Sequence, residues 1–92
     1  MKNEPGIDHW RSRIDKINRA LLALLQTRVA AARRIGAIKK KNGMAISDRK
    51  REKAIVDHLV ALNKGPLDEK GVRVIFKTII RETKRIERGV KL

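Results

Sequence analysis

Residues 28–43, RVAAARRIGAIKKKNG, carry six positive side chains and no negative one. Such a run has two chemical uses: a continuous basic surface for nucleic acid, or a few cations aimed at one small anionic ligand. In a helix, Lys39 lies three turns beyond Arg28 and only about 20° around the axis from it. The remaining cations lie more than about 100° away and are expected to face solvent; they are Arg33, Arg34, Lys40 and Lys41.

Arg28 and Lys39 occupy a helix face that the sequence otherwise fills with apolar residues. An inward-pointing cation is costly unless it meets a counter-charge or borders a ligand-filled cavity. Acids also stand on inward faces, at Glu52 and at Glu87, which is one turn beyond Thr83. Spacing alone leaves two interpretations open. One is a buried salt-bridge network, for instance between Arg28 and Glu52, and the other is a polar binding site inside a helical bundle.

The run SDRKRE adds three groups to this set. Asp48 and Glu52 lie one turn apart, and their face leads into apolar positions, so it is expected to point inward. Arg51 flanks that face. Cations and acids on several helices could therefore meet at one place.

Three helices are expected to position these groups, over residues 7–41, 48–64 and 68–88, in a single all-α domain, residues 1–92. Apolar residues recur every three or four positions, and no stretch alternates with period two. Ser47 or Asp48 can cap the second helix, Asp68 can cap the third, and Gly89 follows its end. The expected apolar stripes are Ile55, Leu59 and Leu62 in the second helix, and Val72, Phe76, Ile79 and Thr83 in the third.

The first helix determines the expected architecture. At ~1.5 Å per residue it spans roughly 50 Å, whereas a compact chain of this length has a radius of gyration of only ~12 Å. Its apolar seam therefore predicts pairing with a second copy, as an intertwined helical homodimer. Arg11 lies roughly 25 Å before Arg28 along this helix, so in an antiparallel pair it can reach the partner's site. The expected seam runs through Trp10, Ile14, Ile17, Leu21, Leu24, Ala31, Ile35 and Ile38.

Composition excludes several classes of function. Lys and Arg number 24 against 10 acids, giving a net charge of +14 that attracts anionic partners. The absence of cysteine excludes disulfides and thiolate sites, and His9 and His58 lack partners at metal-ligand spacing, so no metal is expected. Two aromatic residues are too few for a stacking platform on single strands. No apolar run approaches the ~20 residues of a membrane span, which predicts a soluble, cytoplasmic protein without membrane contact.

Taken together, the charged positions and their apolar frames resemble the all-helical, type II class of chorismate mutases over nearly the whole chain. The matching features are Arg11 before IDKIN, Arg28 after LLALLQT, Lys39 after IGAI, the run ISDRKRE, and FKTIIRET leading to Glu87. The resemblance implies a homodimer of three-helix chains whose long first helices pair. It also implies the Claisen rearrangement of chorismate to prephenate, towards phenylalanine and tyrosine, with no metal, nucleophile or organic cofactor.

The resemblance assigns the cations to the substrate's negative groups. Arg11 from the partner chain and Arg28 would grip the two carboxylates, a task for which guanidinium forks are suited. Lys39 would contact a carboxylate and the ether oxygen, where negative charge develops as the bond breaks.

Further roles follow from the resemblance for the second and third helices. Glu52, helped by the backbone of Asp48, would hold the ring hydroxyl. Arg51 would border the same pocket, and Thr83 would place a hydroxyl near a carboxylate. Glu87 stands where many members have glutamine as a second donor to the ether oxygen, so its carboxyl must be protonated to donate.

Two rival functions remain. Isochorismate-pyruvate lyase shares the fold and a similar cationic pocket, although its members commonly keep glutamine at the position of Glu87. A basic helical nucleic-acid-binding or adaptor protein explains the +14 charge better, yet gives no reason for Arg28 and Lys39 on the seam. Nucleic acid is therefore the less favoured partner. A partner enzyme of the same pathway is another candidate for the excess charge.

Overall fold

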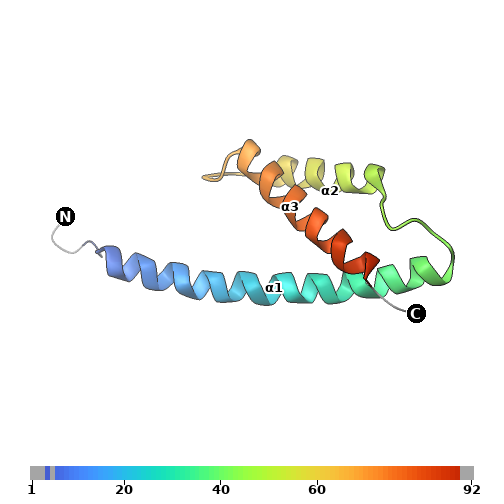
Figure 1. Ribbon diagram of the computed structural model, residues 1–92. Helices are drawn as coiled ribbons and strands as arrows, with labels where there is room; N and C mark the ends of the chain where they lie inside the picture. Colours follow the sequence, from blue (N-terminus) through green and yellow to red (C-terminus); the bar gives the residue numbers. More distant parts are fainter. Residues whose placement is uncertain (1–3, 5, 90–92) are drawn as a thin grey trace. The chain divides into compact units, whose positions relative to one another are not determined.

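The computed structural model describes Glu4 and residues 6–89, and the regular structure of that part is helical. Three helices follow one another: α1 (Ile7–Lys41), α2 (Arg49–Leu62) and α3 (Glu69–Arg88) (Figure 1). The all-α prediction is confirmed for these residues. α1 has the expected bounds, α2 is shorter than expected at both ends, and α3 begins one residue later than expected.

Local side-chain and backbone hydrogen bonds explain the helix ends. A carboxylate oxygen of Asp48 accepts the N–H of Arg51 at 3.0 Å, and one of Asp68 accepts that of Gly71 at 2.7 Å. Both satisfy donors that the first turn of a helix leaves unpaired. The turn after α1 is made at Gly43, whose φ of 67° lets the N–H of Met44 bond back to the carbonyl of Lys39 at 2.7 Å. This turn directs the chain back towards the side chains at the end of α1.

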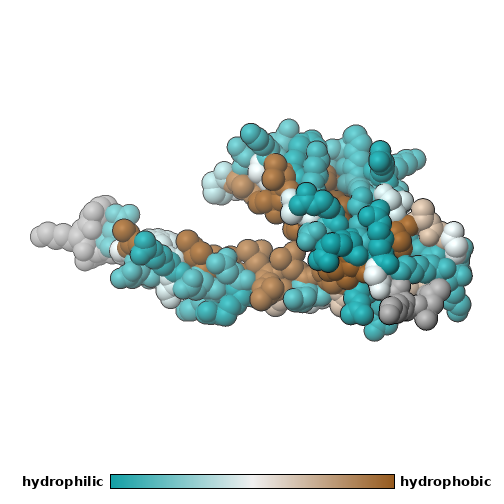
Figure 2. Space-filling view, viewed as in Figure 1, coloured by the Kyte–Doolittle hydropathy of each residue, from teal (hydrophilic) through white to brown (hydrophobic). Residues whose placement is uncertain are grey.

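The chain forms two compact units, one up to Ala31 and one from Ala32. In the first unit, α1 carries large apolar side chains that are between 49% and 69% exposed in the single chain. Figure 2 shows apolar residues along this helix. Those exposed to this degree are Ile7, Trp10, Ile14, Ile17, Leu21, Leu22 and Leu24.

The second unit contains the end of α1 together with α2 and α3, and its buried apolar residues are Ala32, Val56, Val72 and Ile80. The expected stripe of α3 is confirmed at Val72 and Thr83, which are both buried. In α2 the buried residue is Val56, whereas the expected Leu62 is exposed. Ile35 and Ile38 are at least half exposed, whereas Ala32 and Gly36 are buried. A Cβ built on Gly36 would lie 3.2 Å from the Cβ of Glu87, so α3 approaches α1 too closely for a large side chain.

Lys40 corrects a second expectation. The helical angle placed it among the solvent-facing cations, yet it is half-buried and its ammonium donates to the carbonyl of Arg88 at 2.7 Å. Arg88 is the last residue of α3, and this carbonyl has no partner within its own helix. A cation there is also favoured by the helix dipole. Arg33, Arg34 and Lys41 are exposed as expected.

Candidate active site

Contacts in the second unit bring three helix ends together. The end of α1 meets the end of α3 where Gly36 lies against Glu87 and where Lys40 bonds to Arg88. The start of α2 meets α3 through an ion pair between Glu52 and Lys84, 3.0 Å from Oε1 to Nζ. The expected site residues Lys39, Glu52, Thr83 and Glu87 all stand on these helix ends.

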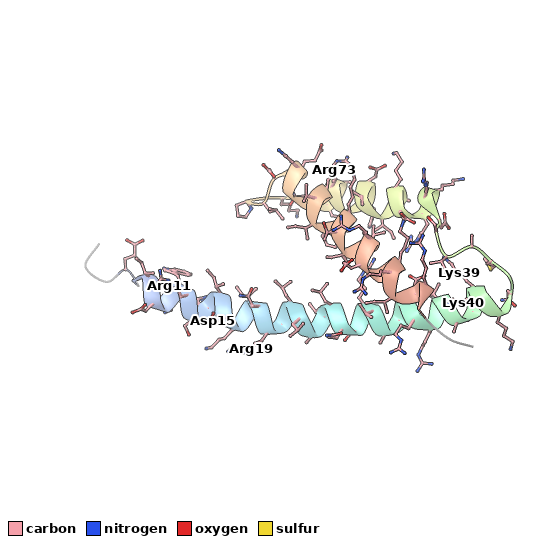
Figure 3. All side chains as sticks on the ribbon, viewed as in Figure 1. Arg11, Asp15, Arg19, Lys39, Lys40 and Arg73 are labelled. Atoms are coloured by element: carbon pink, nitrogen blue, oxygen red, sulfur yellow. The ribbon has the colours of Figure 1, made fainter. Side chains whose placement is uncertain are left out.

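Lys39 lies near the end of α1, and its side chain bonds to the loop that follows this helix (Figure 3). Its side chain is half-buried, and its Nζ donates to the carbonyl of Ile46 at 3.0 Å. An ammonium has three N–H donors, so two remain for an anionic or ether oxygen. The bond restrains a flexible side chain and keeps its charge near the start of α2.

Glu52 is the acid with the most donors around it. Its Oε2 accepts the backbone N–H of Asp48 at 3.2 Å and the hydroxyl of Ser47 at 3.4 Å, and its Oε1 accepts Lys84. Burial by itself would raise the pKa of Glu52. The hydrogen bond from Lys84, the Asp48 amide, the charge of Lys84 and the Ser47 hydroxyl together outweigh burial and lower this pKa. The carboxylate is therefore ionised at neutral pH and can accept a hydroxyl.

Glu87 and Thr83 are the two buried polar residues among those described, at 8% and 5% exposed. The hydroxyl of Thr83 donates to the carbonyl of Ile79 at 2.7 Å. Glu87 forms no hydrogen bond or ion pair with any described residue. Among the described residues no buried side-chain nitrogen or oxygen lacks a hydrogen-bond partner, so the carboxylate oxygens of Glu87 reach the surface although little of the residue is exposed. They are therefore accessible to a ligand.

The other expected residues lie apart from this buried set. Asp48 is exposed, with its side chain occupied in capping α2, and Arg51 is exposed as well. Arg11 and Arg28 belong to the first unit, where Arg11 is exposed and Arg28 is half-buried. The salt-bridge interpretation offered Arg28 as an example of a partner for Glu52. Within the second unit, Lys84 forms an ion pair with that carboxylate.

Lys84 is the residue that the sequence reasoning missed. The expected stripe of α3 followed Ile79, whereas the structure buries Ile80 to 7% exposure. Lys84 lies four residues after Ile80 and therefore on the same side of the helix. The two isoleucines at 79 and 80 were the available signal, because either could begin the inward row.

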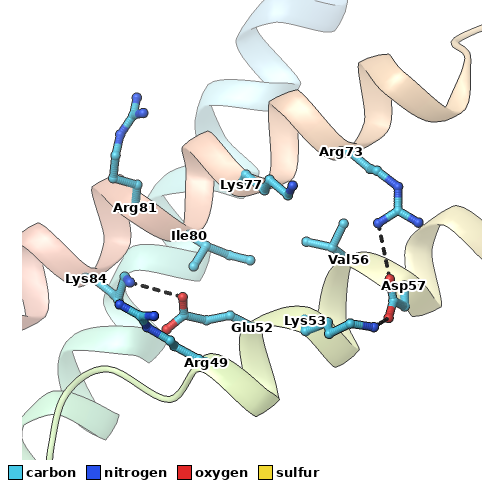
Figure 4. A pocket seen from close by; sticks show the side chains of 10 residues that line it. All are labelled: Arg49, Glu52, Lys53, Val56, Asp57, Arg73, Lys77, Ile80, Arg81 and Lys84. Carbon is cyan, nitrogen blue, oxygen red and sulfur yellow. Dashed lines mark hydrogen bonds and ion pairs between the residues drawn. The ribbon is translucent and has the colours of Figure 1, made fainter.

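A groove between α2 and α3 continues from this pair (Figure 4). Val56 and Ile80 form its apolar floor, and its lining carries six cations but only two acids. Both acids are paired, Glu52 with Lys84 and Asp57 with two cations. Hydrogen bonds from Lys53 and then Arg73 lower the pKa of Asp57. The groove is lined by Arg49, Glu52, Lys53, Val56, Asp57, Arg73, Lys77, Ile80, Arg81 and Lys84.

The described residues hold no group of three or more His, Cys, Asp or Glu side chains able to bind a metal ion. None of the helices in this part of the chain has the length and apolar character needed to cross a membrane.

The described residues form an all-α chain with a long first helix, and its second unit carries Lys39, Glu52 and Glu87 on neighbouring helix ends. Residues 10–88 match the family described as chorismate mutase type II, and the chain belongs to this family. The resemblance found in the sequence is thereby confirmed.

Known proteins agree with this membership. A bifunctional chorismate mutase/prephenate dehydratase from Aquifex aeolicus is 33% identical over 86 residues, covering 89% of this chain and 24% of that protein. One from Neisseria gonorrhoeae is 35% identical over 82 residues, covering 89% and 22%. The chain thus spans about a quarter of the length of the curated relatives it matches.

A solved structure has the same fold. Chorismate mutase (form II) from Thermus thermophilus aligns with a TM-score of 0.88 at 32% identity, covering 89% of this chain and 93% of that one.

Proposed function

We propose that this chain catalyses the rearrangement of chorismate to prephenate. The observation that carries the proposal is Glu87, a carboxyl that is 8% exposed and has no partner among the described residues. A fold that keeps such a group at the meeting point of two helices gains no stability from it. A donor to a substrate atom accounts for its position.

The reaction is a shift of bonds within one molecule, so the protein must hold a reactive conformer and stabilise developing charge. Lys39 has two free N–H donors for a carboxylate and for the ether oxygen. Glu87, when protonated, adds a second donor to that oxygen. Arg28 and the partner chain's Arg11 would grip the carboxylates.

The remaining residues would orient the ring. Glu52 accepts the ring hydroxyl, with its carboxylate held by the backbone of Asp48. Thr83 must turn its hydroxyl from the carbonyl of Ile79 to donate to a substrate carboxylate. Arg51, which is exposed at the start of α2, would border the bound substrate and add positive charge.

The proposal includes a homodimer. The apolar row of the first unit, from Ile7 to Leu24, is about half exposed or more in one chain. A row of this size exceeds what monomeric proteins usually expose, and a second α1 carries the same row to cover it. Pairing would also supply Arg11 to the partner's site.

A partner that consumes prephenate is a further part of the proposal. The relatives from Aquifex aeolicus and Neisseria gonorrhoeae join chorismate mutase and prephenate dehydratase in one protein. The chain described here covers only the mutase-like quarter of that length. A separate or attached dehydratase would receive the product, in the cytoplasm, where we expect the chain to act.

The test is incubation of the purified chain with chorismate, following the loss of its absorbance and identifying the product. We expect prephenate without pyruvate. A parallel incubation with isochorismate that released pyruvate, without prephenate from chorismate, would favour the lyase. Salt-dependent DNA binding without any turnover would favour the nucleic-acid alternative.

A further inference from the structure

We propose that Lys84 is a positioning residue for Glu52, and that it fixes which carboxylate oxygen accepts the ring hydroxyl of the substrate. This inference rests on the proposed function. It concerns a residue to which neither the family resemblance nor the helical periodicity gave a role.

The hydrogen bonds of Glu52 leave little freedom for a substrate. A carboxylate offers about four lone-pair positions on its two oxygens. Oε2 accepts two donors, the amide of Asp48 at 3.2 Å and the hydroxyl of Ser47 at 3.4 Å, while Oε1 accepts Lys84 at 3.0 Å. One position remains, and it lies on Oε1, the oxygen that Lys84 holds. The ring hydroxyl must therefore bind beside the ammonium of Lys84.

The Glu52–Lys84 pair differs from the surface pairs of the same groove. Its side chains are 23% and 22% exposed, whereas those of Lys53 and Asp57 are 79% and 40% exposed. Exposed pairs restrain their partners little because solvent competes for both charges. The Glu52–Lys84 pair is mostly shielded, and it joins two helices (Figure 4). It can therefore hold both the position and the rotation of the carboxylate.

The charges around Glu52 support this role. Arg49 from its own helix and Lys77 and Arg81 from α3 line the same groove, while Lys39 stands at the end of α1. The other acid of the lining, Asp57, is paired with Lys53 and Arg73. Among the cations of the groove, Lys84 forms the ion pair with Glu52. The lowered pKa of Glu52 is consistent with this contact.

Replacing Lys84 with Met removes the donor and keeps an unbranched apolar stem. Oε1 then loses its restraint, and Glu52 can rotate away from the substrate. We expect kcat/KM to fall roughly tenfold, mainly through KM, as for loss of a hydrogen bond to a charged group. Because Lys84 favours the ionised carboxylate, its loss also raises the pKa of Glu52. The acid side of the pH profile then moves to higher pH.

The experiment measures kcat and KM on the full chain from pH 4 to 9. Every variant is also compared in a Glu87→Gln background, so that protonation of Glu87 does not overlap with that of Glu52. Lys84→Arg should restore the parent's KM and the parent's decline of activity at low pH, which we call the acid limb. Lys77→Met is the matched control, because Lys77 lies on the same helix and groove but has no ion pair among the described residues, and it should behave as the parent chain. Lys84→Leu, which also lacks a donor, replaces the Met variant if thermal unfolding shows that the latter is not folded.

Two outcomes overturn the role of Lys84. One is a Lys84→Met variant with the parent's KM and acid limb. The other is a loss of activity that leaves the acid limb in place and is not restored by Lys84→Arg, because this would indicate a structural role only. Absence of turnover in the unsubstituted chain would instead overturn the proposed function itself, so the two failures are distinguishable.

Discussion

The two units of the chain depart from ordinary burial in opposite ways: the first exposes large apolar residues, and the second buries polar ones. In the first, α1 leaves isoleucines, leucines and Trp10 about half exposed. In the second, the same helix buries Ala32 and Gly36, and α3 buries Thr83 and Glu87. Large apolar residues in water and polar residues in the interior both cost stability. Each unit therefore contains residues that lower the stability of a single chain and that a partner or a ligand could cover.

These two sets of residues call for different partners. An exposed apolar row is satisfied by another apolar row, and we propose a second copy of the chain. The carboxyl of Glu87, which has no partner among the described residues, can be satisfied by a polar ligand atom, and we propose the substrate. We therefore propose that the first unit assembles the protein and that the second acts on chorismate. Variants in each unit test this division.

The largest expected effect comes from the two inward cations, one in each unit. Arg28→Ala and Lys39→Ala should each lower kcat/KM about 10³-fold, because each removes a positive group from charge that is bound or develops in the reaction. Helical circular dichroism should remain unchanged. Initial rates with chorismate provide the measurement.

Matched controls for these variants lie on the exposed side of the same helix. Arg33→Ala pairs with Arg28→Ala and Lys41→Ala with Lys39→Ala, and both controls should keep the parent's rate. Activity retained in either inward variant would support the salt-bridge interpretation for that residue.

The next effect tests the apolar row of the first unit. Leu21→Asp should raise the dissociation constant of the homodimer about 10²-fold or more, because two leucines leave the interface together. Sedimentation over a range of concentrations measures it. Ser12→Asp adds the same charge on the opposite face of α1 and should leave assembly unchanged. A monomeric parent chain with full activity would contradict both the pairing and the role of Arg11.

A smaller effect separates the acids of the second unit. Glu87 must carry a proton to donate, so the rate should rise as pH falls from 8 to 5. Glu52 must remain ionised, and its lowered pKa keeps it so over this range. Glu87→Gln should have a flatter profile, because an amide donates at every pH. Constant turnover of the parent chain over this range would show that Glu87 does not have this role.

The smallest effect tests the close approach of α1 and α3. Gly36→Ala places a Cβ 3.2 Å from that of Glu87, so the helices must move apart by a few tenths of an ångström. We expect kcat to fall about threefold to tenfold, because misplacement of a reacting group by ~1 Å can cost 10²-fold. Gly6→Ala is the control, because nothing lies within 4 Å of its added Cβ. Equal activity in both variants would mean that Glu87 tolerates the shift.

Much of the fold was predictable because its signals are local. Asp48 and Asp68 cap α2 and α3 through residues three positions away, and such bonds depend on the chain's own neighbours. The end of α1 was also marked in the sequence, by Gly43. The roles predicted for Arg11, Arg28, Lys39 and Glu52 came from the family resemblance and remain to be measured.

The predictions failed where packing between helices determines the outcome. Gly36 lies outside the expected apolar seam of α1, yet it is buried because α3 approaches α1 at that point. Lys40 was expected in solvent, yet it meets the last carbonyl of α3. Helical spacing predicts which residues of one helix share a face, but it does not predict which residue of another helix they contact.

The sequence predicted three helices and their approximate ends, because caps and periodicity act within one segment. It also predicted which charged residues lie on the inward sides of these helices. Which acid meets which base depended on how the helices pack. Lys84 contacts Glu52 across 32 positions of sequence, and Glu87 is buried without a partner among the described residues because Gly36 admits α3 so closely. Both outcomes depend on the distance between helices, which is set by the packing of all their side chains together.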